Sequence, residues 1–388
     1  MKVLFVHNGL GTGGAERSLA ELLPGLAEAG ITPIVACLYR RNEGMERAVL
    51  ERGFDVRFLR ARRTLSRALE IRKLIRRERP DVVHTTIFEA NVSGRLAAAG
   101  TGAVVVSSLV NTPWGAGRAL DPNVRRPKVV AAQRIDAFTA RHLTDHFHAI
   151  THAVRDWAVE TLGLRPERIT VIERGRDPER LGEPGAGRRA KVRGSLGLTP
   201  DDEVILAVGR QEYQKGHRYL LEAMPGLLER RPNVVLLVAG RKGNASAELE
   251  RLLAGLDPAR VRLLGHRDDV PDLLAAADVF AFPSLYEGLG GSLLEAMALA
   301  LPIVASDVPA IREVLDGGAC GLLVPTASPA ELGVAIERLL GDDGLRAGLA
   351  ERGRARFLER YTLMRSTARM VELYRGLVAP VAAMIGGA

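Results

Sequence analysis

The chain has 388 residues, of which 47% are apolar and 26% are charged, and its formal net charge is +8. This length is enough for two domains that each bury a core, and the composition excludes an intrinsically disordered chain. Two cysteines, Cys37 and Cys320, are too few for a disulfide framework or a metal site, which suits a reducing cytoplasm.

The first half of the chain alternates strand and helix patterns. The apolar run at residues 2–7 is too short for a signal peptide and predicts a first strand, followed by a helix over residues 14–29. Further strands are expected at residues 32–38, 55–59, 82–84, 104–109 and 146–150. Such alternation predicts a parallel sheet with right-handed crossovers. No run reaches the ~18 apolar residues that a membrane span needs.

A glycine-rich loop separates the first strand from the first helix. Gly9, Gly11 and Gly14 satisfy the dinucleotide fingerprint G-x-G-x-x-G. Such a fingerprint expects an acidic residue after the second strand, where this chain has Tyr39-Arg40-Arg41, which would suit only a 2′-phosphate. An NADP-dependent oxidoreductase is therefore one hypothesis for the function.

Cationic residues are concentrated in one segment, with ten Arg or Lys and two Glu between Arg57 and Arg79. Half of them lie on a predicted helix over residues 64–78. Such a face can contact an anionic membrane, or it can simply be a solvated surface. Nucleic acid is not expected as a partner, because only 4% of residues are aromatic and no binding motif is present.

The second half repeats the alternation after a segment rich in Gly, Arg and Pro, residues 180–200, which is typical of a linker. Strands are expected at residues 204–208, 234–239, 261–264, 279–282 and 303–305, and helices close the chain from about residue 330 to 377.

The most informative stretch is residues 283–295, in which a glycine-rich turn leads from a buried strand into a helix. The amides of a helix's first turn and the positive end of its dipole form a site for phosphate. Glu295, one turn into the helix, suits hydroxyl donors such as those of a ribose. Glu287 precedes the turn. The alternative is two solvated glutamates beside an ordinary turn.

A second loop adds positive charge. The strand at residues 204–208 ends in Gly209-Arg210, and Lys215 follows just before a predicted helix. Open α/β sheets bind ligands at the carboxyl ends of their strands, so both cations should lie at that edge. A guanidinium and an ammonium together suit a diphosphate whose negative charge grows as it leaves.

These motifs resemble a known family. Gly209-Arg210 with Lys215-Gly216, residues 287–298 and Pro302-Ile-Val-Ala-Ser are similar to the donor half of the retaining glycosyltransferases of family four, and Gly13-Gly14-Ala15-Glu16 extends the likeness to the first half. The resemblance implies an α/β GT-B fold, two Rossmann-like domains with parallel sheets facing across a cleft. The expected division is an acceptor-binding domain (1–176), a linker (177–200), a nucleotide-sugar domain (201–360) and a helix crossing back, with a tail (361–388).

The resemblance also implies an activity and a site. We expect transfer of a sugar, with retention, from a nucleotide diphosphate donor (UDP favoured, GDP as the alternative) to a glycan, lipid-linked or small-molecule acceptor. No cofactor and no metal are expected, because no carboxylate cluster suggests one. An inactive sugar-nucleotide-binding protein is the remaining alternative. The catalytic candidates are Arg210, Lys215 and Glu287, and the donor-binding candidates are Gly13, Gly14, Gly209, Arg210, Lys215, His266, Arg267, Glu287, Gly288, Leu289, Gly290, Gly291 and Glu295.

The chain departs from the family's pattern after the strand at residues 104–109. Many members carry a histidine there, whereas this chain has Ser107, Ser108 and Asn111. Asn111 is the predicted substitute, and His84, which closes an earlier strand, is the second acceptor-side candidate. The expected location is the cytoplasm, with peripheral contact at the inner face of a membrane.

Overall fold

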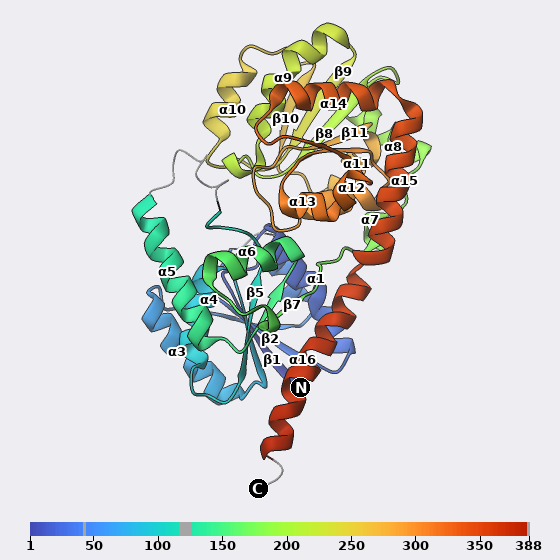
Figure 1. Ribbon diagram of the computed structural model, residues 1–388. Helices are drawn as coiled ribbons and strands as arrows, with labels where there is room; N and C mark the ends of the chain where they lie inside the picture. Colours follow the sequence, from blue (N-terminus) through green and yellow to red (C-terminus); the bar gives the residue numbers. More distant parts are fainter. Residues whose placement is uncertain (42–43, 116–125, 386–388) are drawn as a thin grey trace. The chain divides into compact units, whose positions relative to one another are not determined.

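The computed structural model describes residues 1–41, 44–115 and 126–385. These divide into two compact units (Figure 1). Of the described residues, the N-terminal unit contains 1–41, 44–114, 126–175 and 363–385, and the C-terminal unit contains 115 and 176–362. The last helix of the chain therefore belongs to the N-terminal unit.

The N-terminal unit is built on a parallel sheet whose order, over the described residues, is β3-β2-β1-β4-β5-β6-β7. Its strands are β1 (Lys2–His7), β2 (Thr32–Cys37), β3 (Asp55–Phe58), β4 (Val82–Thr86), β5 (Val104–Leu109), β6 (His146–Ala149) and β7 (Ile169–Val171). Its helices are α1 (Gly14–Glu28), α2 (Met45–Glu51), α3 (Thr64–Glu78), α4 (Phe88–Ala98), α5 (Arg126–Leu143), α6 (His152–Leu162) and α16 (Leu363–Ile385).

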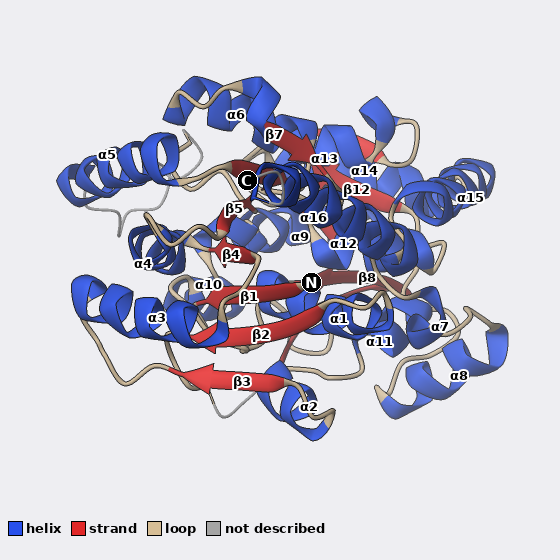
Figure 2. Ribbon diagram, turned by 90° about the horizontal axis from the view of Figure 1, so that it is seen from below, coloured by secondary structure: helices blue, strands red, loops and turns tan. Residues whose placement is uncertain are grey.

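Alternate residues of β1 point into two separate apolar cores. Val3 and Phe5 pack with residues of α1 and α16, whereas Leu4 and Val6 pack with residues of α3 and α4. Figure 2 shows these helix pairs on opposite sides of the sheet. A sheet covered on both faces needs apolar residues at every position of its central strand, which explains the unbroken apolar run at residues 3–6.

The C-terminal unit has a second parallel sheet, of order β10-β9-β8-β11-β12-β13. Its strands are β8 (Glu203–Val208), β9 (Val234–Ala239), β10 (Val261–Gly265), β11 (Val279–Phe282), β12 (Ile303–Ser306) and β13 (Leu322–Val324). Its helices are α7 (Pro178–Leu181), α8 (Ala186–Ser195), α9 (His217–Arg230), α10 (Ser246–Leu253), α11 (Val270–Ala276), α12 (Gly291–Ala298), α13 (Pro309–Val314), α14 (Pro329–Gly341) and α15 (Asp343–Arg360).

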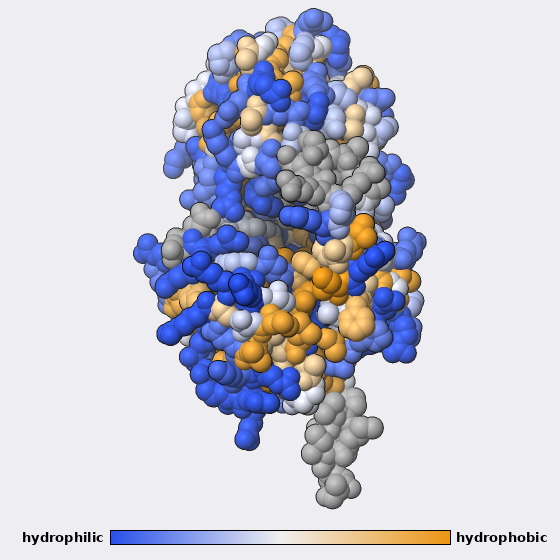
Figure 3. All heavy atoms as spheres, turned by 90° about the vertical axis from the view of Figure 1, so that its left-hand side faces the viewer, coloured by the Kyte–Doolittle hydropathy of each residue, from blue (hydrophilic) through white to orange (hydrophobic). Residues whose placement is uncertain are grey.

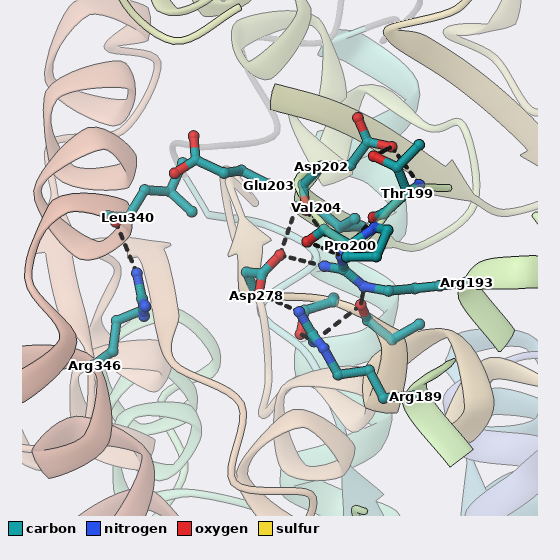
Figure 4. A network of polar contacts seen from close by, with 12 residues as sticks. Arg189, Arg193, Thr199, Pro200, Asp202, Glu203, Val204, Asp278, Leu340 and Arg346 are labelled. Carbon is teal, nitrogen blue, oxygen red and sulfur yellow. Dashed lines mark hydrogen bonds and ion pairs between the residues drawn. The ribbon is translucent and has the colours of Figure 1, made fainter. Parts of the chain in front are cut away.

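Residues 177–200 differ from the linker predicted for them, because they form α7 and α8 within the C-terminal unit. Two arginines of α8 explain the difference. Arg189 and Arg193 both bind the carboxylate of Asp278, at the start of β11, and Arg193 donates to it at 2.6 Å (Figure 4). The same carboxylate accepts from the backbone N–H of Val204 at 2.7 Å. Arginines that the sequence analysis counted as part of a linker thus tie a helix to the sheet.

Candidate functional site

The loops that follow β8 and β11 are joined by hydrogen bonds at the carboxyl edge of the C-terminal sheet. The amide N–H of Leu285 donates to the carbonyl of Gln214 at 2.8 Å, and the side chain of Gln214 donates to the carbonyl of Tyr286 at 2.9 Å. Ser292, in the first turn of α12, donates to the carbonyl of Val208 at 3.1 Å. The two loops predicted from the sequence therefore form one structure.

Lys215 and Glu287, one from each loop, form an ion pair with Nζ and Oε1 separated by 2.5 Å. Ser284 also donates to this carboxylate, at 2.9 Å. The side chains of Lys215 and Glu287 are 19% and 8% exposed. Interpreting Glu287 and Glu295 as solvated surface glutamates is therefore wrong, since both are buried.

The aromatic ring of Phe282 connects Lys215 to the beginning of α12. The ammonium of Lys215 lies 5.4 Å from the ring centroid. Gly290, whose φ is +91°, packs against the same ring, so that a Cβ there would lie 3.0 Å from two ring carbons. Leu289 and Gly288 are buried in the turn. Lys215 and the glycine turn thus border one region, where the N–H groups of a helix's first turn favour an anion.

Arg210 lies at the same edge of the sheet, directly after Gly209. Its guanidinium is 3.2 Å from the carboxylate of Glu212, and the side chain is 48% exposed. The alkyl chain of Lys215 covers Gly209, where a Cβ would come within 3.2 Å of it. Arg210 is therefore more open to solvent than Lys215, although both follow the same strand.

His266 and Arg267 follow β10, two strands away from β8. Nε2 of His266 lies 3.3 Å from Asp268, and Arg267 donates to both carboxylate oxygens of Asp269 at 2.7 and 2.5 Å. Asp269 stands at the N-cap position of α11, but its side chain makes no capping bond. The carboxylate of Asp269 is bound by Arg267 instead.

Glu295 lies one turn into α12 and is 3% exposed. Its Oε1 accepts a hydrogen bond from Nε of Arg176 at 3.0 Å. Sequence analysis missed Arg176, because 119 residues separate the partners and no local pattern marks such a contact.

Sequence analysis also missed His217, which is buried beneath the loop that follows β8. Its Nε2 is 3.2 Å from the carbonyl oxygen of Gly209. Burial lowers the pKa of His217 to about 4, so the ring is neutral at neutral pH.

In the N-terminal unit, Gly13 is the N-cap residue of α1 and Gly14 its first residue. The carboxylate of Glu16 reaches back over Gly13, where a Cβ would lie 2.2 Å from Oε2. A carboxylate at this helix terminus occupies the region in which the dinucleotide fingerprint would place a pyrophosphate. The geometry therefore disfavours the oxidoreductase hypothesis.

The two acceptor-side candidates differ in their surroundings. His84 is 3% exposed and its ring nitrogens contact Tyr374 of α16 and Ser108 of β5. It lines a cavity of about 50 Å³ within the N-terminal unit, together with His148 and Arg174. Asn111 is half-buried, and its side-chain oxygen accepts from the N–H of Thr112 at 2.8 Å.

A cavity of about 360 Å³ lies elsewhere, between α8, α11 and α15. Asp278 and Pro302, which precede β11 and β12, line it, so it lies at the amino edge of the C-terminal sheet. None of the predicted donor-site residues lines this cavity.

Among the described residues, no group of three or more His, Cys, Asp and Glu side chains is placed to hold a metal ion. Nor does that part of the chain contain a helix long and apolar enough to span a membrane.

Both halves of the chain match family models. Residues 12–180 match the model described as "Glycosyltransferase Family 4" and residues 202–342 the model described as "Glycosyl transferases group 1". The chain is 31% identical over 357 residues to the lipopolysaccharide core biosynthesis glycosyltransferase LpsE of Rhizobium meliloti, covering 91% of this chain and 93% of that protein.

Other curated relatives are matched over a shorter length. The UDP-Gal:alpha-D-GlcNAc-diphosphoundecaprenol alpha-1,3-galactosyltransferase of Escherichia coli is 28% identical over 62% of this chain and 61% of its own length. The chain spans about half the length of several relatives that are 33–35% identical to it.

Among solved structures, Anabaena Alr3699/HepE in complex with UDP-glucose superposes with a TM-score of 0.84 at 22% identity, over 97% of this chain and 100% of that one. This likeness confirms the predicted fold class.

Proposed function

Because the chain belongs to the group 1 glycosyltransferases of family four, we propose that it transfers a sugar, with retention, from a nucleotide diphosphate donor to a hydroxyl acceptor. The observation that carries this proposal is the Lys215–Glu287 ion pair of 2.5 Å beside the glycine turn that opens α12. A partly buried ammonium next to a helix N-terminus suits a diphosphate leaving group.

The donor favoured by this proposal is a UDP-sugar, with a GDP-sugar as the alternative. The printed names of two similar proteins support it, since HepE of Anabaena was solved with UDP-glucose and the Escherichia coli relative is named for UDP-Gal. Backbone groups of the β10–α11 corner would border the base. His266 and Arg267 would contribute only if they left Asp268 and Asp269, to which they are paired.

The charge that develops on the leaving diphosphate would be stabilised by Lys215, Arg210 and the first-turn amides of α12, without a metal ion. As the leaving group is stabilised, the anomeric bond loosens towards an oxocarbenium ion. The acceptor hydroxyl then attacks from the face that the diphosphate leaves, which retains the configuration. Glu287 would hold Lys215 in place and face the sugar.

The proposed acceptor is a glycan or a lipid-linked sugar, and one surface favours a site at a membrane. On α3, Leu65 and Leu69 are 72% and 64% exposed. Lys73 and Arg76, also exposed, have no ion-pair partner among the described residues. Figure 3 shows the side on which α3 and α5 lie, with apolar groups among hydrophilic ones. Apolar and cationic side chains on one helix suit an anionic membrane, here the inner face.

The membrane part of this proposal is tested by sedimentation with two kinds of vesicle. One consists of phosphatidylcholine alone, and in the other one third of the lipid is phosphatidylserine. Binding to the anionic vesicles should fall about tenfold or more in the variant Lys73→Glu/Arg76→Glu, since each cation near the surface contributes ~1 kcal/mol. The same substitution at Lys242, exposed in the C-terminal unit, is the control. Equal binding by both variants would contradict the proposed contact between α3 and the membrane.

The transfer proposal is tested by thermal shift with UDP, GDP, ADP and TDP sugars and with NADPH, followed by an assay of transfer and of slow donor hydrolysis. Stabilisation by one sugar nucleotide, with transfer or hydrolysis, is the expected result. Stabilisation by NADPH alone would support the oxidoreductase instead. Nucleotide binding with neither transfer nor hydrolysis would indicate an inactive sugar-nucleotide-binding protein.

A further inference from the structure

We propose that Arg176 is a positioning residue that orients Glu295 towards the ribose hydroxyls of the donor, and that it thereby sets the preference of the site for a ribonucleotide. The inference rests on the proposed function, because it presumes that a nucleotide diphosphate binds at α12. It adds a residue that lies outside the glycine-rich motif, at the start of the segment 176–362 of the C-terminal unit.

The ion pair between Arg176 and Glu295 is almost completely buried. Nε of Arg176 lies 3.0 Å from Oε1 of Glu295, and both side chains are 4% exposed. The backbone of Arg176 is held as well, because its N–H donates to the carbonyl of Tyr361 at 2.9 Å and the residue forms an isolated parallel β-bridge with Thr362. The guanidinium is therefore fixed at both ends of the residue.

The guanidinium also lies against the first turn of α12. A Cβ on Gly291 would be 2.4 Å from Nη2 of Arg176 and 3.4 Å from Cζ. Gly291 and Glu295 are four residues apart and lie on one face of the helix, so the guanidinium spans the face between them. This contact explains why the first helical residue is a glycine although its φ is not in the left-handed region.

A gain in the stability of the fold does not explain why the charge of Arg176 lies at this position. A cation beside a helix N-terminus opposes the helix dipole, and a buried ion pair seldom stabilises a fold more than apolar residues of the same volume would. The pair does fix a carboxylate. An ionised carboxylate only accepts hydrogen bonds, and a guanidinium that holds one oxygen sets the plane in which the group presents its other acceptor sites.

Two vicinal hydroxyls are donors that such a carboxylate recognises. Glu295 held by Arg176 should therefore distinguish a ribose from a sugar without hydroxyls, because a buried carboxylate facing the latter would lose partners. The base and the diphosphate contact other residues, so their contribution to affinity should not depend on Arg176.

The test compares the affinities of UDP and of 2′,3′-dideoxy-UDP by calorimetry in the full chain. The wild type should prefer UDP by about 10-fold to 100-fold. Arg176→Lys keeps the charge but loses the planar fork, so the preference should fall below about threefold while dideoxy-UDP binds as before. An unchanged preference in this variant would overturn the inference, as would an equal loss of affinity for both ligands.

A second variant leaves both charges in place. Gly291→Ala should push the guanidinium away from Glu295 and lower the preference in the same way, because the added Cβ would overlap Nη2. The matched control is Gly194→Ala in α8, where a Cβ meets nothing within 4 Å. An unchanged preference in Gly291→Ala, with affinity for both ligands retained, would also contradict the inference. If the wild type bound neither ligand, the proposed function itself would fail, which is a different result.

Discussion

The hydroxyl of Tyr374 donates a hydrogen bond to Nδ1 of His84, 2.5 Å away, and so connects the last helix of the chain to the N-terminal sheet. The direction of this bond follows from the chain of bonds behind it. Nε2 of His148 donates to the carbonyl of Ile172, so its Nδ1 accepts from Ser108. Ser108 then accepts from Nε2 of His84, which leaves Nδ1 as the acceptor for Tyr374. Every member of this relay is neutral.

Removing the first donor of the relay should destabilise the N-terminal unit. Tyr374→Phe keeps the ring, which is completely buried, but leaves Nδ1 of His84 without its donor. A buried acceptor that loses its partner costs about 1–3 kcal/mol. We expect the free energy of unfolding to fall by that amount in urea titrations. Tyr219→Phe is the control, since that ring is only half-buried and its hydroxyl has no hydrogen bond among the described residues. Equal stability of both variants would contradict the relay.

The stability of the N-terminal unit should fall as the pH is lowered below about 6.5. Burial lowers the pKa of His148 from 6.5 to about 4. Between these values the unfolded chain holds a proton that the folded chain does not, so lowering the pH favours unfolding. The contribution is fully present above pH 6.5 and about 3 kcal/mol is lost by pH 4. Thermal unfolding between pH 7 and 4.5 should show a shallower decline for His148→Gln, and parallel curves would refute this assignment.

Much of the fold was predictable from local pattern. The strand at residues 2–7 and the helix at residues 64–78 have the predicted bounds, because an unbroken apolar run and a helical apolar period are properties of neighbouring residues. The short strands β7 and β13 were not predicted. Each has three residues, too few to show a period.

The candidate site was predictable in part for the same reason. Lys215 and Glu287 follow adjacent strands, and the end of each strand was visible in the sequence, so their proximity could be expected. Arg176, by contrast, reaches Glu295 through tertiary contact alone. The same holds for Tyr374 and His84, which are 290 residues apart.

Removing either cation of the donor loop should slow sugar transfer. We expect Lys215→Ala or Arg210→Ala to lower turnover by about 10²-fold or more, if each supplies the several kcal/mol typical of a fixed charge at a leaving group. Single-turnover measurements, with the sugar nucleotide that the thermal-shift screen selects, would show this loss in the chemical step. Lys242→Ala is the matched control, since this lysine is 78% exposed and pairs with Glu250 in the same unit. Near-wild-type transfer by both site variants would remove these assignments.

The contact between Gly216 and Pro283 should decide whether the two donor loops remain joined. Gly216 has a φ of +63°, and a Cβ there would lie 1.9 Å from the carbonyl oxygen of Pro283. A backbone carbonyl cannot move aside as the end of a flexible side chain can. Gly216→Ala must therefore separate the loops that follow β8 and β11. Because Lys215 precedes Gly216 and Glu287 follows Pro283, their 2.5 Å ion pair should be lost with it. We expect a loss of transfer at least as large as that of Lys215→Ala.

Gly197 separates this effect from the strain of a left-handed residue. Its φ of +64° is almost that of Gly216, but a Cβ there meets nothing within 4 Å. Gly197→Ala therefore carries only the conformational penalty, about 1–2 kcal/mol. If Gly216→Ala lowers stability by no more than Gly197→Ala and transfers sugar normally, the loops do not depend on that contact. The expected result is that Gly216→Ala alone loses both more stability and sugar transfer. This result would show that the backbone contact between Gly216 and Pro283 holds Lys215 beside the carboxylate of Glu287.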